Sequence, residues 1–109
     1  MSNEARAIDR RSAERHKITL DIHWQGRLGQ AKGTICDLNR ESCFVLAGGE
    51  ISDGETVHVF IPIGEGMKAQ FTGVVTNHEE DIGFAVRFAE LGQAQQDVLD
   101  NLIRNGADA

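Results

Sequence analysis

The regular alternation of apolar and polar residues is the feature that most restricts the fold of this chain. In residues 17–24, "KITLDIHW", every second residue is apolar, and the same period of two returns in residues 56–63 and 82–88. This period places apolar side chains on one face of a β-strand. Together with three less regular segments, the pattern predicts six strands, over residues 17–24, 30–38, 43–47, 56–63, 68–77 and 82–88.

The inner faces of the clearest strands follow from the same period. They are expected to carry Ile18, Leu20, Ile22, Trp24, Val57, Val59, Ile61, Ile63, Ile82, Phe84, Val86 and Phe88. Apolar residues then fall on one stripe of a helix, at Leu91, Val98, Leu99, Leu102 and Ile103, and Asn105–Gly106 supplies a stop. The expected fold is therefore mainly β, a six-stranded antiparallel β-barrel with a C-terminal α-helix packed on it.

Length and composition indicate one soluble domain. The chain has 109 residues, 40% of them hydrophobic, without a run of 18 apolar residues that would span a membrane. Its first residues are too polar for a signal peptide, which predicts a cytoplasmic protein. Two cysteines are too few for a disulfide scaffold, and we expect Cys36 and Cys43 to be small buried hydrophobes.

Positive charge is concentrated before the first strand. The whole chain carries −6, but residues 6–17 carry +3, which leaves −9 on the remainder. An acidic body repels duplex DNA, whereas a local basic segment can capture a small anion. The alternative is a solvated basic tail.

Other kinds of site find little support in the sequence. The four histidines are widely spread and lack the spacing of a zinc site, and no nucleophile has a recognisable base. Trp24, Phe71, Phe84 and Phe88 fit a core better than a base-stacking face, so neither DNA nor RNA is an expected partner. These patterns favour a protein that is not an enzyme and needs no metal or cofactor.

Two short motifs stand at particular places in this strand order. "RSAER", residues 11–15, precedes the first strand, and "DLNRES", residues 37–42, follows the second. With the late strand "GFAVRF" and the final helix, they make the chain resemble a PilZ domain, the bacterial receptor module for cyclic di-GMP. The family has Arg-x-x-x-Arg and Asp/Asn-x-Ser-x-x-Gly at these places.

The resemblance implies a split-barrel type of β-barrel with a flexible basic N-terminal arm. The domain would cover residues 9–104, with disordered tails at residues 1–8 and 105–109. The implied ligand is cyclic di-GMP, and the implied ligand-binding residues are Arg10, Arg11, Arg15, Asp37, Asn39 and Ser42. Guanidinium groups suit phosphate oxygens and the O6 and N7 atoms of guanine, and an ionised Asp accepts from guanine N–H groups.

The second motif departs from the family pattern at two positions. Asn39 stands where the family has Ser, and Ser42 stands where it has Gly. If the backbone at residue 42 needed a positive φ, Ser42 would cost about 1–2 kcal/mol relative to Gly. Glu41 would repel a phosphate if its side chain pointed toward the ligand.

Two functions remain open at this point. The first is a receptor that binds cyclic di-GMP and passes the signal to an unidentified effector protein, in motility or exopolysaccharide regulation as is usual for the family. The second is a degenerate PilZ-like interaction module that no longer binds cyclic di-GMP. Neither involves membrane insertion.

Overall fold

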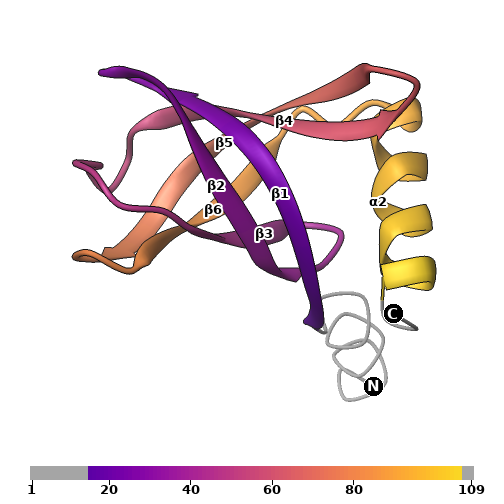
Figure 1. Ribbon diagram of the computed structural model, residues 1–109, viewed down its shortest axis with the longest axis horizontal. Coiled ribbons are helices and arrows are strands. Elements are labelled where there is room, and N and C mark those ends of the chain that lie inside the picture. Colours follow the sequence, from indigo (N-terminus) through magenta and orange to yellow (C-terminus); the bar gives the residue numbers. More distant parts are fainter. Residues whose placement is uncertain (1–14, 107–109) are drawn as a thin grey trace, which may run out of the picture.

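The computed structural model describes residues 15–106, which form six strands and one helix (Figure 1). Arg10 and Arg11, the predicted tail at residues 1–8 and the last three residues lie outside the described residues. The elements are β1 (His16–Gly26), β2 (Gly29–Leu38), β3 (Ser42–Leu46), β4 (Thr56–Gly64), β5 (Met67–Glu79), β6 (Gly83–Ala89) and α2 (Gln93–Gly106). Each predicted strand is present, and the predicted fold is confirmed.

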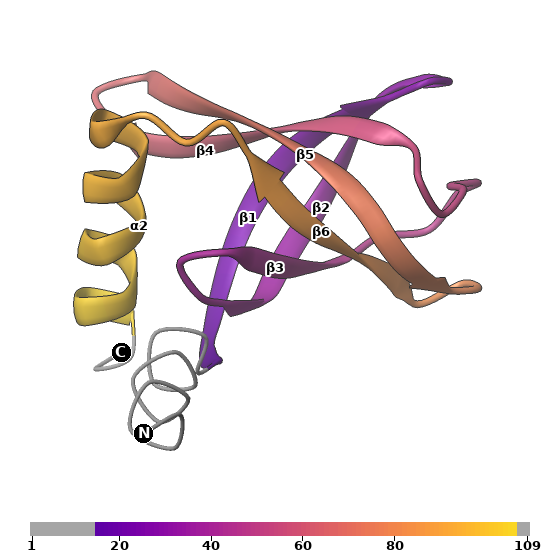
Figure 2. The ribbon, with the colours of Figure 1, turned by 180° about the vertical axis from the view of Figure 1, so that it is seen from behind.

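The strands form a closed barrel in the order β1-β2-β3-β6-β5-β4, and every neighbouring pair is antiparallel. Figures 1 and 2 show α2 at one end of this barrel, beside the β4–β5 hairpin and the β2–β3 connection. The β1–β2 and β5–β6 turns lie at the opposite end. Within residues 15–106, no helix has the length and apolar character needed to cross a membrane.

The core fills the barrel with the side chains that the alternation predicted. Trp24 packs edge-on against Phe84, with ring centroids 4.8 Å apart, and Phe71 lies 5.4 Å from Phe88. Leu99 is fully buried and anchors α2 to this core. The other buried apolar residues are Ile18, Ile22, Ile35, Leu38, Cys43, Val45, Val57, Val59, Ile61, Val75 and Val86.

Four residues that were expected to be buried are not fully buried. Ile63 is 46% exposed and Ile82 is 51% exposed, and Leu20 and Cys36 are only partly buried. Ile63 lies in a register shift between Pro62 and Gly64, and Cys36 lies in a similar shift in β2. Ile82 precedes the first residue of β6 and belongs to the turn. At Ile63, Cys36 and Leu20, the last beside the register shift between Lys17 and Leu20, an irregularity in the pairing interrupts the period of two, whereas Ile82 lies outside the strand.

Gly83 is a point of close approach between two strands. A Cβ atom there would lie 2.1 Å from the carbonyl oxygen of Val45 on β3. The obstacle is backbone, which cannot rotate away as a side chain can. Only glycine fits at this pairing of β6 with β3.

We expect Gly83→Ala to lower the free energy of unfolding by about 1–3 kcal/mol, since β3 and β6 must separate to admit the methyl group. Gly48→Ala is the control, because a Cβ atom at Gly48 meets nothing within 4 Å. Urea unfolding of both variants measures the difference. Equal stability of the two variants would contradict the close approach of Gly83 to the Val45 backbone.

Burial also governs the chemistry of the Cys43 thiol. The complete burial of this side chain raises its pKa from 9.0 to about 12. The thiol is therefore expected to ionise in the unfolded chain at a lower pH than in the folded one. The stability that depends on the neutral thiol is present below about pH 9 and is lost as the pH rises toward 12.

The comparison of the natural protein with Cys43→Ala tests this expectation. At pH 8 the natural protein should be the more stable, because alanine leaves a small cavity. Above pH 9 this advantage should shrink by about 1.4 kcal/mol per pH unit. Urea unfolding at pH 8, 9.5 and 10.5 measures it, and an advantage that does not change with pH would show that the folded state does not hold the thiol neutral.

Candidate ligand-binding site

Residues from both predicted motifs meet on the outer surface of the barrel. Arg15, Asp37 and Ser42 line one small cavity of about 50 Å³. The cavity is completed by Leu38, Cys43, Phe44, Thr76 and Ala85. Arg15 lies just before β1, Asp37 near the end of β2 and Ser42 at the start of β3. The fold thus brings together segments that are more than 20 residues apart in the chain.

The strand register explains this placement. Asp37 on β2 pairs with Phe44 on β3, and Phe44 pairs in turn with Ala85 on β6. Phe44 and Ala85 are partly exposed and alternate with buried neighbours, so they face outward. The three residues form one row across the outer face of three strands, and this row is the floor of the cavity.

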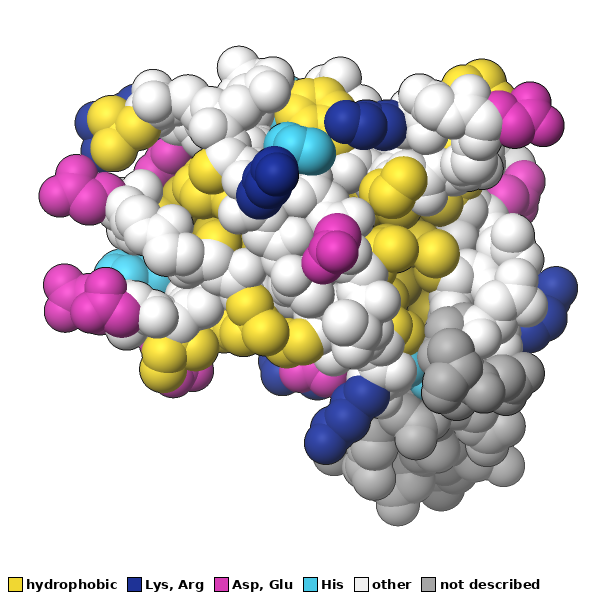
Figure 3. All heavy atoms as spheres, viewed as in Figure 1, with side chains coloured by type: hydrophobic (Ala, Val, Ile, Leu, Met, Phe, Trp, Pro, Cys, Tyr) yellow, Lys and Arg dark blue, Asp and Glu magenta, His cyan; other side chains and the backbone are white. Residues whose placement is uncertain are grey.

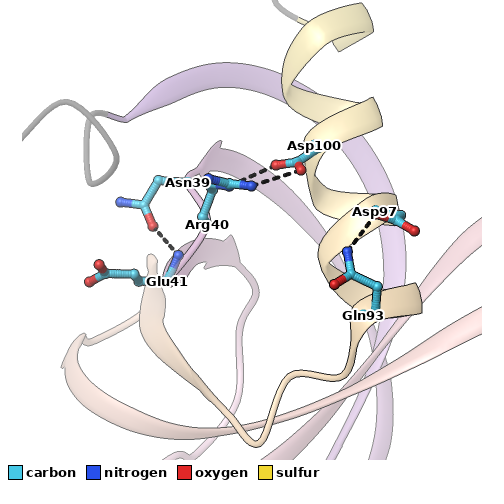
Figure 4. Close-up of polar contacts among 6 residues, drawn as sticks. All are labelled: Asn39, Arg40, Glu41, Gln93, Asp97 and Asp100. Atoms are coloured by element: carbon cyan, nitrogen blue, oxygen red, sulfur yellow. Dashed lines mark hydrogen bonds and ion pairs between the residues drawn. The ribbon is translucent and has the colours of Figure 1, made fainter. Parts of the chain in front are cut away.

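Asn39 lies beneath the site, not on its surface. The residue is 5% exposed, and its Oδ1 atom accepts hydrogen bonds from the backbone N–H groups of Glu41 and Ser42, both at 2.7 Å. The Ser42 hydroxyl donates to the same atom at 3.3 Å. The N–H group of Asn39 donates to the Ser42 carbonyl at 2.9 Å. Asn39 therefore closes the β2–β3 loop on itself (Figure 4).

The backbone at Ser42 does not have the positive φ that was considered from the family motif. Among the described non-glycine residues, positive φ occurs at Glu65, Asp81 and Glu90. Ser42 is the first residue of β3 and pairs with Arg87 on β6. The expected cost of about 1–2 kcal/mol for serine at this position does not arise.

Of the two residues between Asn39 and Ser42, Arg40 faces the helix, whereas the Glu41 carboxylate points away from it (Figure 4). The Arg40 guanidinium forms a forked ion pair with Asp100 on α2, with Nε–Oδ1 and Nη2–Oδ2 distances of 2.8 Å (Figure 4). Asp100 raises the pKa of Arg40 by hydrogen bonding and by its charge. Arg40 and Glu41 line a separate hollow of about 270 Å³ beside α2. Glu41 is therefore not among the residues lining the cavity that Arg15 and Ser42 share.

Three more side chains belong to the neighbourhood of the cavity and were not predicted. Phe44 lines it, Lys17 pairs with Asp37, and Arg87 pairs with Ser42 and is exposed. Their positions depend on cross-strand register, which no local motif encodes. The alternation along each strand predicts that these side chains face outward. It does not predict which site residue on the neighbouring strand each one lies beside.

Acidic side chains are prominent at the end of the barrel opposite α2. Figure 3 shows a group of them there, where the β3–β4 loop and the β5–β6 turn lie, together with further acidic side chains near the α2 end and on the face between. These segments contain Glu50, Asp53, Glu79, Glu80 and Asp81, and Asp53 pairs with His78 at 2.7 Å. An anion would be repelled from that end. Arg15, Lys17 and Arg87 lie elsewhere, around the cavity.

Other hollows do not contain the predicted site residues. One of about 600 Å³ on the outer face of the barrel is lined by both polar and apolar residues, among them Asp21, His23, Lys32, Leu46 and Pro62. Of the predicted ligand residues that the structure describes, Arg15, Asp37, Asn39 and Ser42, none lines it. Over the part of the chain that the structure describes, no cluster of three or more His, Cys, Asp or Glu is placed to hold a metal ion.

Comparisons with known proteins identify relatives of this barrel. A scan against protein-family models matches residues 9–105 to the PilZ domain. Among curated proteins, no sequence matches the chain. Among solved structures, the PilZ domain of CeSA from a cellulose-synthesizing bacterium is similar, with a TM-score of 0.65 and 14% identity over 84% of this chain and 95% of that one.

Two larger proteins contain a similar fold. The Bacillus subtilis inhibitor of motility (MotI/DgrA) has a TM-score of 0.67 and 17% identity over 86% of this chain and 50% of its own. The Borreliella burgdorferi PlzA protein in complex with cyclic di-GMP has a TM-score of 0.67 and 11% identity over 90% of this chain and 45% of its own. The chain thus spans about half the length of each of these two proteins.

We expect Asn39→Ala to lower the free energy of unfolding by about 1–3 kcal/mol, because the N–H groups of Glu41 and Ser42 lose their acceptor in a partly buried loop. Asn77→Ala, at an exposed position on β5, is the control and should change stability by less than about 0.5 kcal/mol. Thermal or urea unfolding measures both. A loop that tolerates Asn39→Ala as well as the control would show that Asn39 does not support it.

Proposed function

Because the chain belongs to the PilZ domain family, we propose that it is a non-catalytic receptor for cyclic di-GMP that passes the signal to a partner protein. The observation that carries this proposal is the meeting of Arg15, from the first motif, with Asp37 and Ser42, from the second, at one cavity. Each motif alone is weak evidence for a ligand site, because short motifs occur by chance. The fold brings residues of both motifs to one face of the barrel, which the motifs alone do not require.

The chemistry of these side chains suits the ligand. A guanidinium can fork onto two phosphate oxygens or onto O6 and N7 of guanine, and each good bidentate contact contributes about 1–3 kcal/mol. The Asp37 carboxylate can accept from the N1–H and N2–H groups of guanine. The Ser42 hydroxyl can donate to the ligand if it leaves Asn39, to which its 3.3 Å hydrogen bond is long. Asn39 supports the loop, so its part in binding is to hold Ser42.

Additional cations and an apolar floor surround the cavity. Lys17 and Arg87 add positive charge beside Asp37 and Ser42, which favours a ligand with two phosphates. Phe44 offers a partly exposed aromatic ring on which a base can stack. These residues extend the proposed site over β1, β3 and β6.

The cavity is too small to enclose a molecule with two guanines and two phosphates. Small-molecule sites bury about 70–90% of their ligand, which a cavity of about 50 Å³ cannot do. We therefore propose that the ligand lies on the outer face of the barrel and that the segment before β1 covers it. Arg10 and Arg11 would supply further phosphate or guanine contacts from that segment.

The similar structures suggest settings in which such a receptor acts. One is a PilZ domain from a cellulose-synthesizing bacterium, one is an inhibitor of motility, and one is in complex with cyclic di-GMP. We propose a cytoplasmic role of this kind, in exopolysaccharide production or motility, through an effector protein. The competing function is an interaction module of the same family that has lost the ligand.

Calorimetric titration with cyclic di-GMP tests the proposal. We expect saturable binding that Arg11→Ala or Arg15→Ala weakens by about 1–3 kcal/mol each. Arg27→Ala is the control, because it removes the same charge at the β1–β2 turn, at the acidic end of the barrel. All variants should unfold at nearly the same urea concentration, since Arg15 and Arg27 are exposed.

Two outcomes would refute parts of this assignment. Absence of binding heat in the natural protein would favour the interaction module. Equal affinity of Arg15→Ala and Arg27→Ala would remove Arg15 from the site and would leave the ligand to be located elsewhere.

A further inference from the structure

The forked ion pair between Arg40 and Asp100 joins two parts of the molecule that lie 60 residues apart in the chain. Arg40 belongs to the β2–β3 loop, between Asn39 and Ser42. Asp100 lies on α2, next to the fully buried Leu99, which fixes that turn of the helix against the core. Figure 4 shows the Arg40 side chain reaching across to the helix.

The loop itself is tightly organised on its other side. Asn39 Oδ1 accepts from the N–H groups of Glu41 and Ser42, and the Glu41 carbonyl accepts from the Phe88 N–H group on β6 at 2.8 Å. Arg40 is therefore carried by a loop that is hydrogen-bonded to β6 at Glu41 and to itself through Asn39. Because Arg40 binds Asp100, a change in the position of the loop changes the position of the helix.

The helix has few polar attachments elsewhere. Gln95, near its start, donates from Nε2 to the Gln70 carbonyl on β5 at 2.7 Å. Toward its end, Leu102 and Ile103 are only partly buried against the core. Arg40 holds the middle of the helix, between the attachment at Gln95 and this looser end.

We propose that Asp100 is a positioning residue for the ligand site, because its ion pair with Arg40 couples the order of the β2–β3 loop to the hold of α2 on the barrel. This inference rests on the proposed function, in that the loop supplies Ser42 to the cyclic di-GMP site. A ligand that orders the loop then strengthens the attachment of α2 to the barrel. By the same coupling, loss of that attachment lowers the affinity for the ligand by the same factor.

The size of the coupling follows from the exposure of the pair. The side chains of Arg40 and Asp100 are 53% and 33% exposed, and an exposed ion pair changes an equilibrium by about two- to fivefold. The forked geometry places this pair toward the upper end of that range. Effects of this size are measurable in both hydrogen exchange and ligand titration.

The chain offers a matched control on the same helix. Asp97 lies three residues before Asp100 and accepts from Gln93 Nε2 at 3.0 Å instead of binding Arg40 (Figure 4). Asp97→Asn removes the same charge as Asp100→Asn, so any general effect of charge on an anionic ligand appears in both variants. Arg40→Gln breaks the pair from the loop side.

Hydrogen exchange of the ligand-free protein tests the tie itself. Asp100→Asn and Arg40→Gln should each raise the exchange rates of the Glu41 and Ser42 amides and of the α2 amides by about two- to fivefold. Asp97→Asn should leave the Glu41 and Ser42 amides unchanged. The proposal would be overturned if the Glu41 and Ser42 amides exchanged at the same rate in Asp100→Asn as in Asp97→Asn.

Titration with cyclic di-GMP tests the coupling to the ligand. Asp100→Asn should bind about two- to fivefold more weakly than Asp97→Asn, and the double variant Arg40→Gln/Asp100→Asn should bind as Arg40→Gln does. Ligand should protect the α2 amides in Asp97→Asn but not in Asp100→Asn. Tighter binding by Asp100→Asn would overturn the proposal, since it would mean that Asp100 restrains Arg40 from the ligand. Absence of binding in every protein would reject the proposed function, and the exchange of the ligand-free loop would still decide whether the ion pair ties loop to helix.

Discussion

The pairing of β3 with both β2 and β6 is the interaction on which the rest of the site depends. It sets Phe44 between Asp37 and Ala85 and sets Ser42 beside Arg87. A slip of one residue would turn Ser42 and Phe44 into the barrel and expose Cys43. The burial of Cys43 and Val45 opposes such a slip, and Gly83 allows the two backbones to approach. The same contacts that close the core therefore position the candidate ligand residues.

Most of the fold could be predicted because a half-buried strand reveals itself in every second residue. Trp24, Val57 and Phe84 were placed in the core on that ground, and all three are buried. The prediction was wrong where a register shift or a turn interrupts the period, as at Ile63 and Ile82. The period of two marks strand residues only, so it does not locate a register shift or the first residue of a strand.

The candidate site was predictable only in its local parts. Arg15, Asp37 and Ser42 stand in short motifs, and the fold brings them to one cavity. Arg87 and the Arg40–Asp100 pair depend on contacts between segments distant in sequence, for which a single sequence offers no periodic signal. Arg10 and Arg11 stay predictions, because they lie outside the described residues.

The two departures from the family motif are physically linked in this chain. Asn39 supplies one oxygen that accepts from the N–H group of Ser42 and from its hydroxyl. An asparagine side chain is one heavy atom longer than serine before its acceptor, so the loop geometry is adjusted to this residue. The hydroxyl at residue 42 takes part in the same network, which glycine would lack. Since the Ser42 hydroxyl donates to the Asn39 side chain, the effects of substitutions at the two positions should not be additive. An ordered loop of this kind can still present Ser42 to a ligand, so the altered motif by itself is no argument for a receptor that has lost its function.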